Sequence, residues 1–246
     1  MRNLKIYIAY DGSCYHGWQR QENNITVQQV IEDTLLRILG ERVTAHGCSR
    51  TDAGVHAREF CMTVRTDNPI PCPGLVRAMN GQLPDDIAVK SCEDAPEDFH
   101  ARFSSKGKEY VYIINTAPVR DVFANRHALH YPHPLDVPRL DAAAKLYVGE
   151  RDLAAFCRAE SLAQHKTTVR TVYSAGMERC GDRVTFTVSG SGFLHHTVRI
   201  MVGTLLWINE GKISEDNITK AFAAGDRELL GVTAPPDGLY LNKVLY

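Results

Sequence analysis

Strand-like and helix-like segments follow one another irregularly along this chain, and this order constrains the fold more than any other feature of the sequence. Apolar side chains recur at every second position of residues 4–10, the period of a strand buried on one face. Thr26 and Gln29 then form a capping box before an amphipathic segment that ends at Gly40. Further strands are expected near residues 43–48, 60–64, 110–114, 169–175, 184–188 and 240–246, and further helices near 75–79, 140–148, 195–208 and 215–223.

This order lacks the regular strand–helix alternation of a parallel sheet, so it predicts an α+β fold with antiparallel or mixed sheets. A chain of 246 residues has room for two small halves. The acidic, proline-containing stretch Glu93–Asp98 is the best linker candidate. We therefore expect an N-terminal half over 1–98 and a C-terminal half over 99–246.

Composition narrows the class of protein. Apolar residues make up 44% and charged residues 23%, as in ordinary globular proteins, and the net charge of −1 means that a nucleic-acid site must come from local clusters of Lys and Arg. The seven cysteines are scattered and form no CxxC pair, which fits a reducing cytoplasm without a disulfide framework or a cysteine zinc site. The apolar run 200–208 is too short to span a membrane.

The segment Arg50–His56 gathers an arginine, an aspartate and a histidine within seven residues. An aspartate close to a glycine in a turn between two strands is usually only a turn former. However, a cation beside a carboxylate keeps that carboxylate ionised, as a nucleophile or base requires, and Gly54 would let the backbone approach a substrate closely. The spacing indicates a possible site around Asp52 without specifying a reaction.

Residues 49–57 resemble the signature loop of the tRNA pseudouridine synthase A family, G-R-T-D-A-G-V-H-A, with Ser49 in place of the first glycine. Three other stretches are similar to family motifs in the same order, so the resemblance spans almost the whole chain. They are YDGSCYHGWQRQ followed by a T-V-Q helix start, FHARFSSKGKEYVY, and GFLHHTVRIMVG.

The resemblance implies the pseudouridine synthase fold, with two ferredoxin-like halves, and isomerisation of uridine to pseudouridine at positions 38–40 of the tRNA anticodon stem-loop. Asp52 would be the nucleophile, attacking either C6 of the uracil or C1′ of the ribose. No cofactor is implied, and the sequence contains no nucleotide-binding glycine motif or zinc-ligand spacing. Adjacent His195 and His196 would point in different directions on a helix, so no metal site is expected there.

The resemblance also assigns roles to four other residues. Tyr110 matches the active-site tyrosine, which would stack on the uracil, although strands favour tyrosine anyway. Arg199, in an apolar stretch, would form an ion pair with Asp52. Leu194 would form the apolar floor beside the base, or would simply pack in the core. Arg50 would enter the tRNA as the target nucleotide leaves its stack.

Clusters of cations indicate where tRNA could bind, although in a near-neutral protein such runs more often form a solvated face. The aromatic and polar segment 15–20 would suit unpaired bases, or would pack against a sheet. The family resemblance implies a homodimer with tRNA bound across both subunits, and no membrane partner. The cations in question are Arg58, Arg65, Arg102, Lys106, Lys108, Lys166 and Arg170.

Two other functions are compatible with parts of the pattern. A non-catalytic tRNA-binding protein on the same scaffold would not need Asp52, which argues against it here. A hydrolase of nucleoside bonds would need a second, water-activating acid opposite Asp52, and no matching motif is visible in the sequence.

Overall fold

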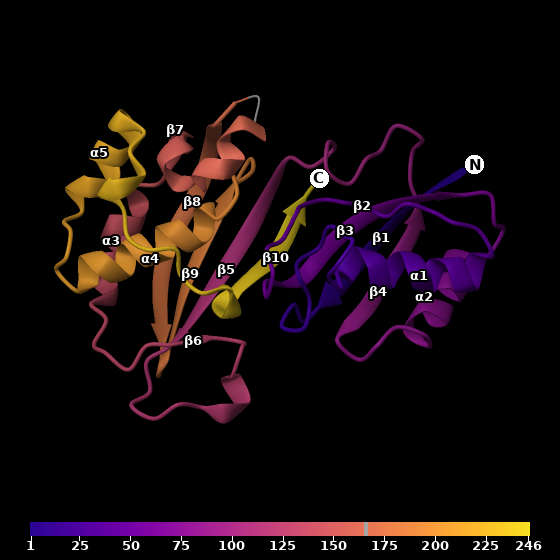
Figure 1. Cartoon of the computed structure of the whole chain (residues 1–246), viewed down its shortest axis with the longest axis horizontal. Helices are drawn as coiled ribbons and strands as arrows, with labels where there is room; N and C mark the ends of the chain where they lie inside the picture. The colour runs from indigo at the N-terminus through magenta and orange to yellow at the C-terminus, as the bar shows by residue number, and fades with distance from the viewer. Residues whose placement is uncertain (165–166) are drawn as a thin grey trace. The chain divides into compact units, whose positions relative to one another are not determined.

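The computed structural model describes residues 1–164 and 167–246 and shows the mixed α+β fold expected from the sequence (Figure 1). The chain divides into two compact units. The first unit comprises Met1–Lys106 together with Tyr240–Tyr246, and the second unit comprises Gly107–Leu239. The C-terminal residues therefore pack with the beginning of the chain, a long-range contact that no local pattern in the sequence indicates.

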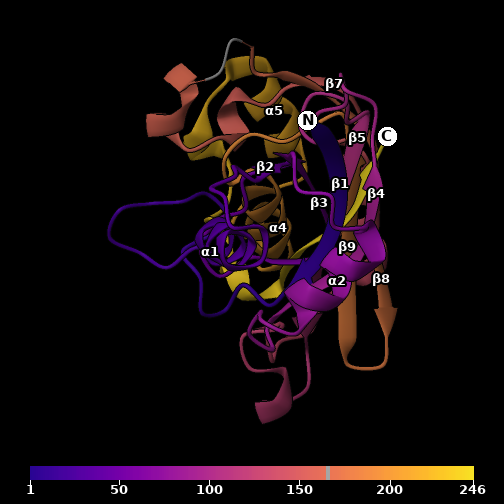
Figure 2. The ribbon, with the colours of Figure 1, turned by 90° about the vertical axis from the view of Figure 1, so that its right-hand side faces the viewer.

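The first unit has the strand–helix–strand–strand–helix–strand order of a ferredoxin-like fold. Its strands pair in the order β4-β1-β3, all antiparallel, with the short β2 on β3, and β10 pairs in parallel with the start of β3. Figure 2 shows α1 to one side of these strands. Its elements are β1 (Arg2–Tyr10), α1 (Val27–Leu39), β2 (His46–Gly47), β3 (His56–Thr66), α2 (Cys72–Asn80), β4 (Ile87–Asp94) and β10 (Leu239–Leu245).

The second unit contains an antiparallel sheet in the order β5-β9-β8-β7, with the short β6 paired in parallel to the end of β5. Helix α3 follows β5 and β6 in the chain and precedes β7 and β8, and β9 lies between β5 and β8 in the sheet. Its elements are β5 (Gly107–Asn115), β6 (Leu129–His130), α3 (Val137–Lys145), β7 (Gly149–Asp152), β8 (Val169–Cys180), β9 (Arg183–Gly190), α4 (Thr197–Asn209) and α5 (Asp216–Ala224), with 3₁₀ turns at Val122–Ala124, Ala154–Phe156, Ala159–Gln164, Arg227–Leu229 and Pro236–Gly238.

The Thr26 cap and the Gly40 end of α1 are confirmed. The Thr26 side chain accepts a hydrogen bond from the Gln29 amide, and Gly40 ends the helix with a φ of 75°. The strand predicted over 43–48 was too long, because only His46–Gly47 pair with β3. Helix α3 begins earlier than predicted because Asp136 caps it, accepting a hydrogen bond from the Arg139 amide.

Helix α4 is buried around most of its circumference, which makes it the central helix of the second unit. A Cβ atom on Gly203 would overlap the carbonyl oxygen of Val232, so this glycine allows the 231–234 segment to pack directly on the helix. Within the residues that the structure describes, no helix has both the length and the hydrophobicity needed to cross a membrane.

Candidate active site

Asp52 lies in the loop between β2 and β3 of the first unit, and this loop forms a tight turn. The Val55 amide donates to the Asp52 carbonyl oxygen at 3.2 Å, and Gly54 has a φ of 78°. Thr51 is buried, Asp52 is half-buried and Arg50 is exposed. The turn therefore exposes part of the Asp52 side chain while its neighbour Thr51 anchors the loop in the protein.

The N-terminal loop after β1 holds this turn in place through hydrogen bonds. The Trp18 amide donates to the Thr51 carbonyl oxygen at 3.2 Å, and the Gly54 amide donates to the Tyr15 carbonyl oxygen at 3.1 Å. The hydroxyls of Tyr10 and Thr51 lie 2.8 Å apart. The first motif and the signature loop, far apart in the sequence, thus form one hydrogen-bonded structure around Asp52.

Two glycines of the N-terminal loop make this close approach possible. A Cβ atom on Gly12 would overlap the carbonyl oxygen of Val55, and one on Gly17 would overlap that of Thr51. Gly17 also has a φ of 83°, which side-chain-bearing residues rarely adopt. The resemblance places these glycines in a family motif, but no local pattern indicates that they contact the Asp52 loop.

His56, at the end of the signature loop, is 1% exposed and joins three segments of the first unit. Its Nδ1 lies 3.1 Å from the Gly12 amide nitrogen and 3.0 Å from the Asp11 carboxylate. Its ring stacks on Tyr240 of β10 at a centroid distance of 4.6 Å, and the Arg58 guanidinium lies 4.7 Å from the centroid of that tyrosine ring. His56 therefore supports the fold of the loop.

The aromatic side chains of the N-terminal loop are mostly structural. Trp18 is 3% exposed and stacks on Phe60 of β3 at 4.2 Å, and Tyr15 is 7% exposed and donates to the Asp86 carboxylate at 2.6 Å. Of the two alternatives for segment 15–20, packing against the sheet therefore holds for these two residues. His16 is exposed.

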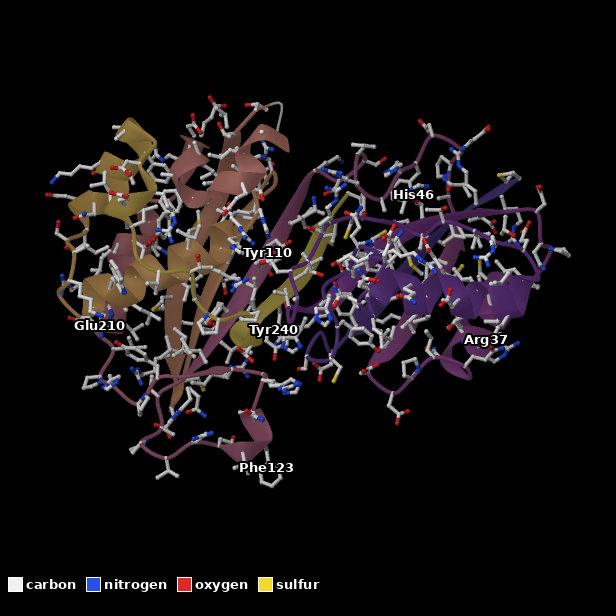
Figure 3. All side chains as sticks on the ribbon, in the orientation of Figure 1. Arg37, His46, Tyr110, Phe123, Glu210 and Tyr240 are labelled. Carbon is white, nitrogen blue, oxygen red and sulfur yellow. The ribbon has the colours of Figure 1, made fainter. Side chains whose placement is uncertain are left out.

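Tyr110 lies on β5 of the second unit, paired with Val188 of β9 (Figure 3). It is 7% exposed, and its ring meets Phe193 edge-to-face at 5.5 Å. The segment 190–196, which carries Phe193 and Leu194, therefore lies beside Tyr110. Leu194 is itself buried, and its amide donates to the Thr197 hydroxyl at 3.1 Å.

Arg199 lies in the first turn of α4, and its side chain is clamped to the neighbouring chain segment. Its Nε donates to the Ala234 carbonyl oxygen at 2.7 Å, and the Ala234 amide donates back to the Arg199 carbonyl oxygen at 3.1 Å. The bond from Nε holds the guanidinium against this segment, and the backbone bond holds the segment against the helix. An arginine in this apolar helix thus has a defined polar partner, as the cost of burying a polar group requires.

The helix predicted from residue 195 begins later, and this corrects the prediction about the histidine pair. His195 and His196 precede α4, and His196 has a φ of 68° as the residue before its first turn. Their rings are 4.0 Å apart rather than directed away from each other. The turn brings them together, since it does not follow helical geometry.

The structure brings the predicted site residues together in two groups. The first group is Arg50 and Asp52, which share one loop of the first unit. The second group lies in the second unit: Tyr110 and Leu194 are in adjoining segments, and Arg199 is in the first turn of α4. Lys166, one of the predicted RNA-facing cations, lies outside the described residues. Tyr10 and Thr51 lie within the two motifs but had no predicted role, because their contact joins segments that are distant in the sequence.

Comparison with known proteins identifies the family. A family model described as tRNA pseudouridine synthase matches residues 6–104 and 143–246. Relatives named tRNA pseudouridine synthase A from Brevibacillus brevis and Geotalea uraniireducens are each 43% identical over 246 residues, covering all of both chains. One named tRNA pseudouridine synthase A 2, from Clostridium perfringens, is 38% identical over the same length and coverage. The chain therefore belongs to the tRNA pseudouridine synthase family, a family of isomerases.

Proposed function

We propose that this protein converts uridine to pseudouridine at positions 38–40 of the tRNA anticodon stem-loop, with Asp52 as the nucleophile. The observation that carries this proposal is the construction of the Asp52 loop. Its sequence resembles the family signature, and hydrogen bonds join it to a second family motif. The Tyr10 and Thr51 hydroxyls contact each other, the Trp18 amide donates to the Thr51 carbonyl oxygen, and the Gly54 amide donates to that of Tyr15. A loop fixed in this way holds the backbone that carries the Asp52 carboxylate in place, which favours nucleophilic catalysis.

The proposed reaction conserves all atoms of the substrate. The bond between N1 of the uracil and C1′ of the ribose breaks, the uracil turns, and a bond forms between C5 and C1′. The proton on C5 is lost and a proton is gained at N1, so the reaction requires no oxidant or reductant. An Asp52 carboxylate would serve either as a nucleophile towards C6 or as one towards C1′, since both atoms are electrophilic in the respective route.

Tyr110 and Arg199 would complete the site from the second unit. The largely buried ring of Tyr110, supported by Phe193, suits stacking on the uracil, and its phenol could take part in the proton transfer at C5. The Arg199 guanidinium, fixed through Ala234, suits an ion pair that orients the Asp52 carboxylate. Leu194 would form the apolar floor beside the base.

Binding of tRNA would rely on local positive charge. Arg50 would fill the space left by the everted nucleotide or contact a phosphate, and Arg58, Arg65, Arg102 and Lys106 are exposed on the first unit. Because the net charge of one chain is only −1, a homodimer would double the cationic surface that faces one tRNA. We therefore propose a cytoplasmic homodimer with tRNA as its substrate.

The test is the reaction of purified protein with an unmodified tRNA transcript, with no added cofactor. Pseudouridine should form at positions 38–40, and Asp52→Asn should abolish the product while the dissociation constant for tRNA stays unchanged. Asp67→Asn, which removes an exposed carboxylate of the same unit, should leave turnover unchanged. Normal turnover by Asp52→Asn would refute the nucleophile, and tRNA binding without any product would favour the non-catalytic alternative.

A further inference from the structure

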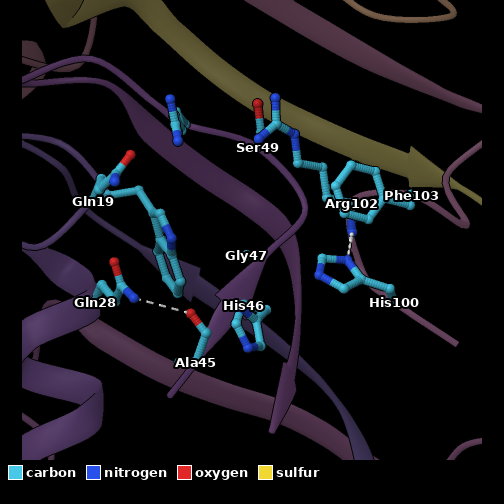
Figure 4. Close-up of a pocket in the computed structure, with 11 residues that line it drawn as sticks. Gln19, Gln28, Ala45, His46, Gly47, Ser49, His100, Arg102 and Phe103 are labelled. Carbon is cyan, nitrogen blue, oxygen red and sulfur yellow. Dashed lines mark hydrogen bonds between the residues drawn. The ribbon is translucent and has the colours of Figure 1, made fainter. Parts of the chain in front are cut away.

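A cavity of about 270 Å³ opens in the first unit beside the signature loop (Figure 4). It lies where the N-terminal loop, the region around β2 and the turn at residues 100–103 meet. The size is close to the lower end of small-ligand sites, about 300 Å³, which suits one nucleotide. Its lining residues are Trp18, Gln19, Gln28, Ala45, His46, Gly47, Ser49, Arg50, His100, Arg102 and Phe103.

One side of the cavity is a continuous row of flat rings. His46 and His100 have ring centroids 5.3 Å apart, and His100 and Phe103 have centroids 4.5 Å apart. Figure 4 shows these side chains beside one another. Phe103 is 77% exposed, whereas Phe60 of the same unit is fully buried in the core. An exposed ring beside two imidazoles offers a surface on which a base can stack.

The charge and the polar groups of the cavity also suit a nucleotide. Arg50 and Arg102 supply two cations, and the Arg102 guanidinium lies 5.7 Å from the centroid of the Phe103 ring. None of the eleven lining residues is acidic. Arginines at the edge of a stacking surface are placed to contact the phosphates that flank a stacked base.

We propose that this cavity is a subsite for one unpaired nucleotide of the tRNA next to the uridine that reacts. Its base stacks on Phe103 and His100, and Arg50 and Arg102 contact its phosphates. The inference rests on the proposed function, because it takes the Asp52 loop as the place of reaction. Arg50 and Asp52 are two residues apart, at most about 7 Å along the chain, which is a suitable separation for adjacent nucleotides.

The physical advantage of such a subsite follows from base eversion. Extruding a uridine from a stem removes a stacking partner from its neighbour and costs a few kcal/mol. A ring surface that accepts the neighbouring base restores stacking lost in the RNA, and it does so without reading sequence, because every base has a flat face. The subsite would therefore stabilise the everted state for different tRNAs.

The first test is Phe103→Ala, measured as the dissociation constant for an unmodified anticodon stem-loop. Loss of one stacked base should weaken binding by about five- to 100-fold. Phe123→Ala provides the matched control, because Phe123 is 93% exposed on a loop of the second unit (Figure 3) and lies outside the cavity. Arg102→Ala should lower the slope of log affinity against log salt by about 1, whereas Phe103→Ala should leave that slope unchanged.

The second test combines Phe103→Ala with stem-loops that carry an abasic site at one position beside the target. When the abasic position is the one that occupies the subsite, it should weaken binding to the native protein. The same abasic stem-loop should bind Phe103→Ala no more weakly than the intact stem-loop does. The subsite would be overturned if Phe103→Ala bound the intact stem-loop as tightly as the native protein does. It would also be overturned if the abasic site and Phe103→Ala weakened binding independently at every flanking position. If the native protein forms pseudouridine in either case, the proposed function stands and only the subsite fails.

Discussion

Gly17 packs against the carbonyl oxygen of Thr51, the residue that precedes Asp52, so closely that a Cβ atom at position 17 would overlap that oxygen. The same pair of loops is joined by the hydrogen bond from the Trp18 amide to Thr51. The position of Asp52 therefore depends on a segment more than thirty residues away in the sequence.

Gly17→Ala should destabilise the protein more than Gly40→Ala. Both glycines have a positive φ, 83° and 75°, so both substitutions strain the backbone by about 1–2 kcal/mol. Only at position 17 does the new methyl group also meet another segment, whereas nothing lies within 4 Å of a Cβ on Gly40. The free energy of unfolding in urea measures the difference, and equal losses for the two variants would show that the Gly17–Thr51 contact is not tight.

Tyr10→Phe should lower both the stability and the turnover number. The substitution removes the hydroxyl that lies 2.8 Å from the Thr51 hydroxyl, a loss of about 1 kcal/mol, and loosens the loop that carries Asp52. Tyr131→Phe is the matched control, because it loses a hydroxyl contact of 3.0 Å with Glu210 in the second unit. The two variants should lose similar free energies of unfolding, but only Tyr10→Phe should lose kcat. Equal kcat values for the two variants would contradict the positioning role of Tyr10.

Arg199→Lys should lower kcat by about ten- to 100-fold with little change in the dissociation constant for tRNA. A lysine keeps the charge but lacks the Nε that donates to Ala234, so the cation would no longer be held in one orientation. Arg179→Lys, whose guanidinium contacts the Leu135 carbonyl oxygen at 3.3 Å on the same unit, should leave kcat unchanged. Full activity of Arg199→Lys would exclude a requirement for the guanidinium.

The pKa of the His100 imidazole should lie below the ordinary value for histidine. Burial lowers the pKa of its imidazole from 6.5, and the neighbouring charges of His46, Arg102 and Arg65 lower it further, against an opposing hydrogen bond to its backbone. NMR titration should therefore give a midpoint under 6.5 that rises in His46→Gln, because one source of repulsion is removed. His133→Gln, in the second unit, should leave the midpoint unchanged, and an unaltered midpoint in His46→Gln would contradict the contribution of His46.

The same shift gives His100 a defined effect on stability. Its folded-state pKa lies below the unfolded value, so the unfolded chain binds more protons as the pH falls through 6.5. The free energy of unfolding should therefore decrease below pH 6.5, and His100→Asn should reduce this part of the pH dependence. Urea unfolding at pH 7.5 and pH 5.5 measures how much free energy of unfolding each protein loses between these pH values. Equal losses in the native protein and His100→Asn would show that His100 does not contribute.

Local sequence patterns predicted much of the fold because their causes are local. The Thr26 cap and Gly40 end of α1 depend on residues within one helix, and the alternation in β1 reflects burial of one face of one strand. The helix from residue 195 was mispredicted at its start because the turn at His196 has no such pattern. The short β2 was overestimated because pairing with β3, rather than propensity, ends a strand.

The candidate site was likewise predictable from the sequence only in part. The residues of the signature loop, and through them the family, could be identified from the sequence, since the chemistry of a carboxylate, an arginine and a tyrosine is carried by their side chains. Which residues hold Asp52 in place, and the row of rings formed by His46, His100 and Phe103, were decided only by tertiary structure. These contacts join segments distant in the chain, and their close packing depends on the folded backbone rather than on any neighbouring residue.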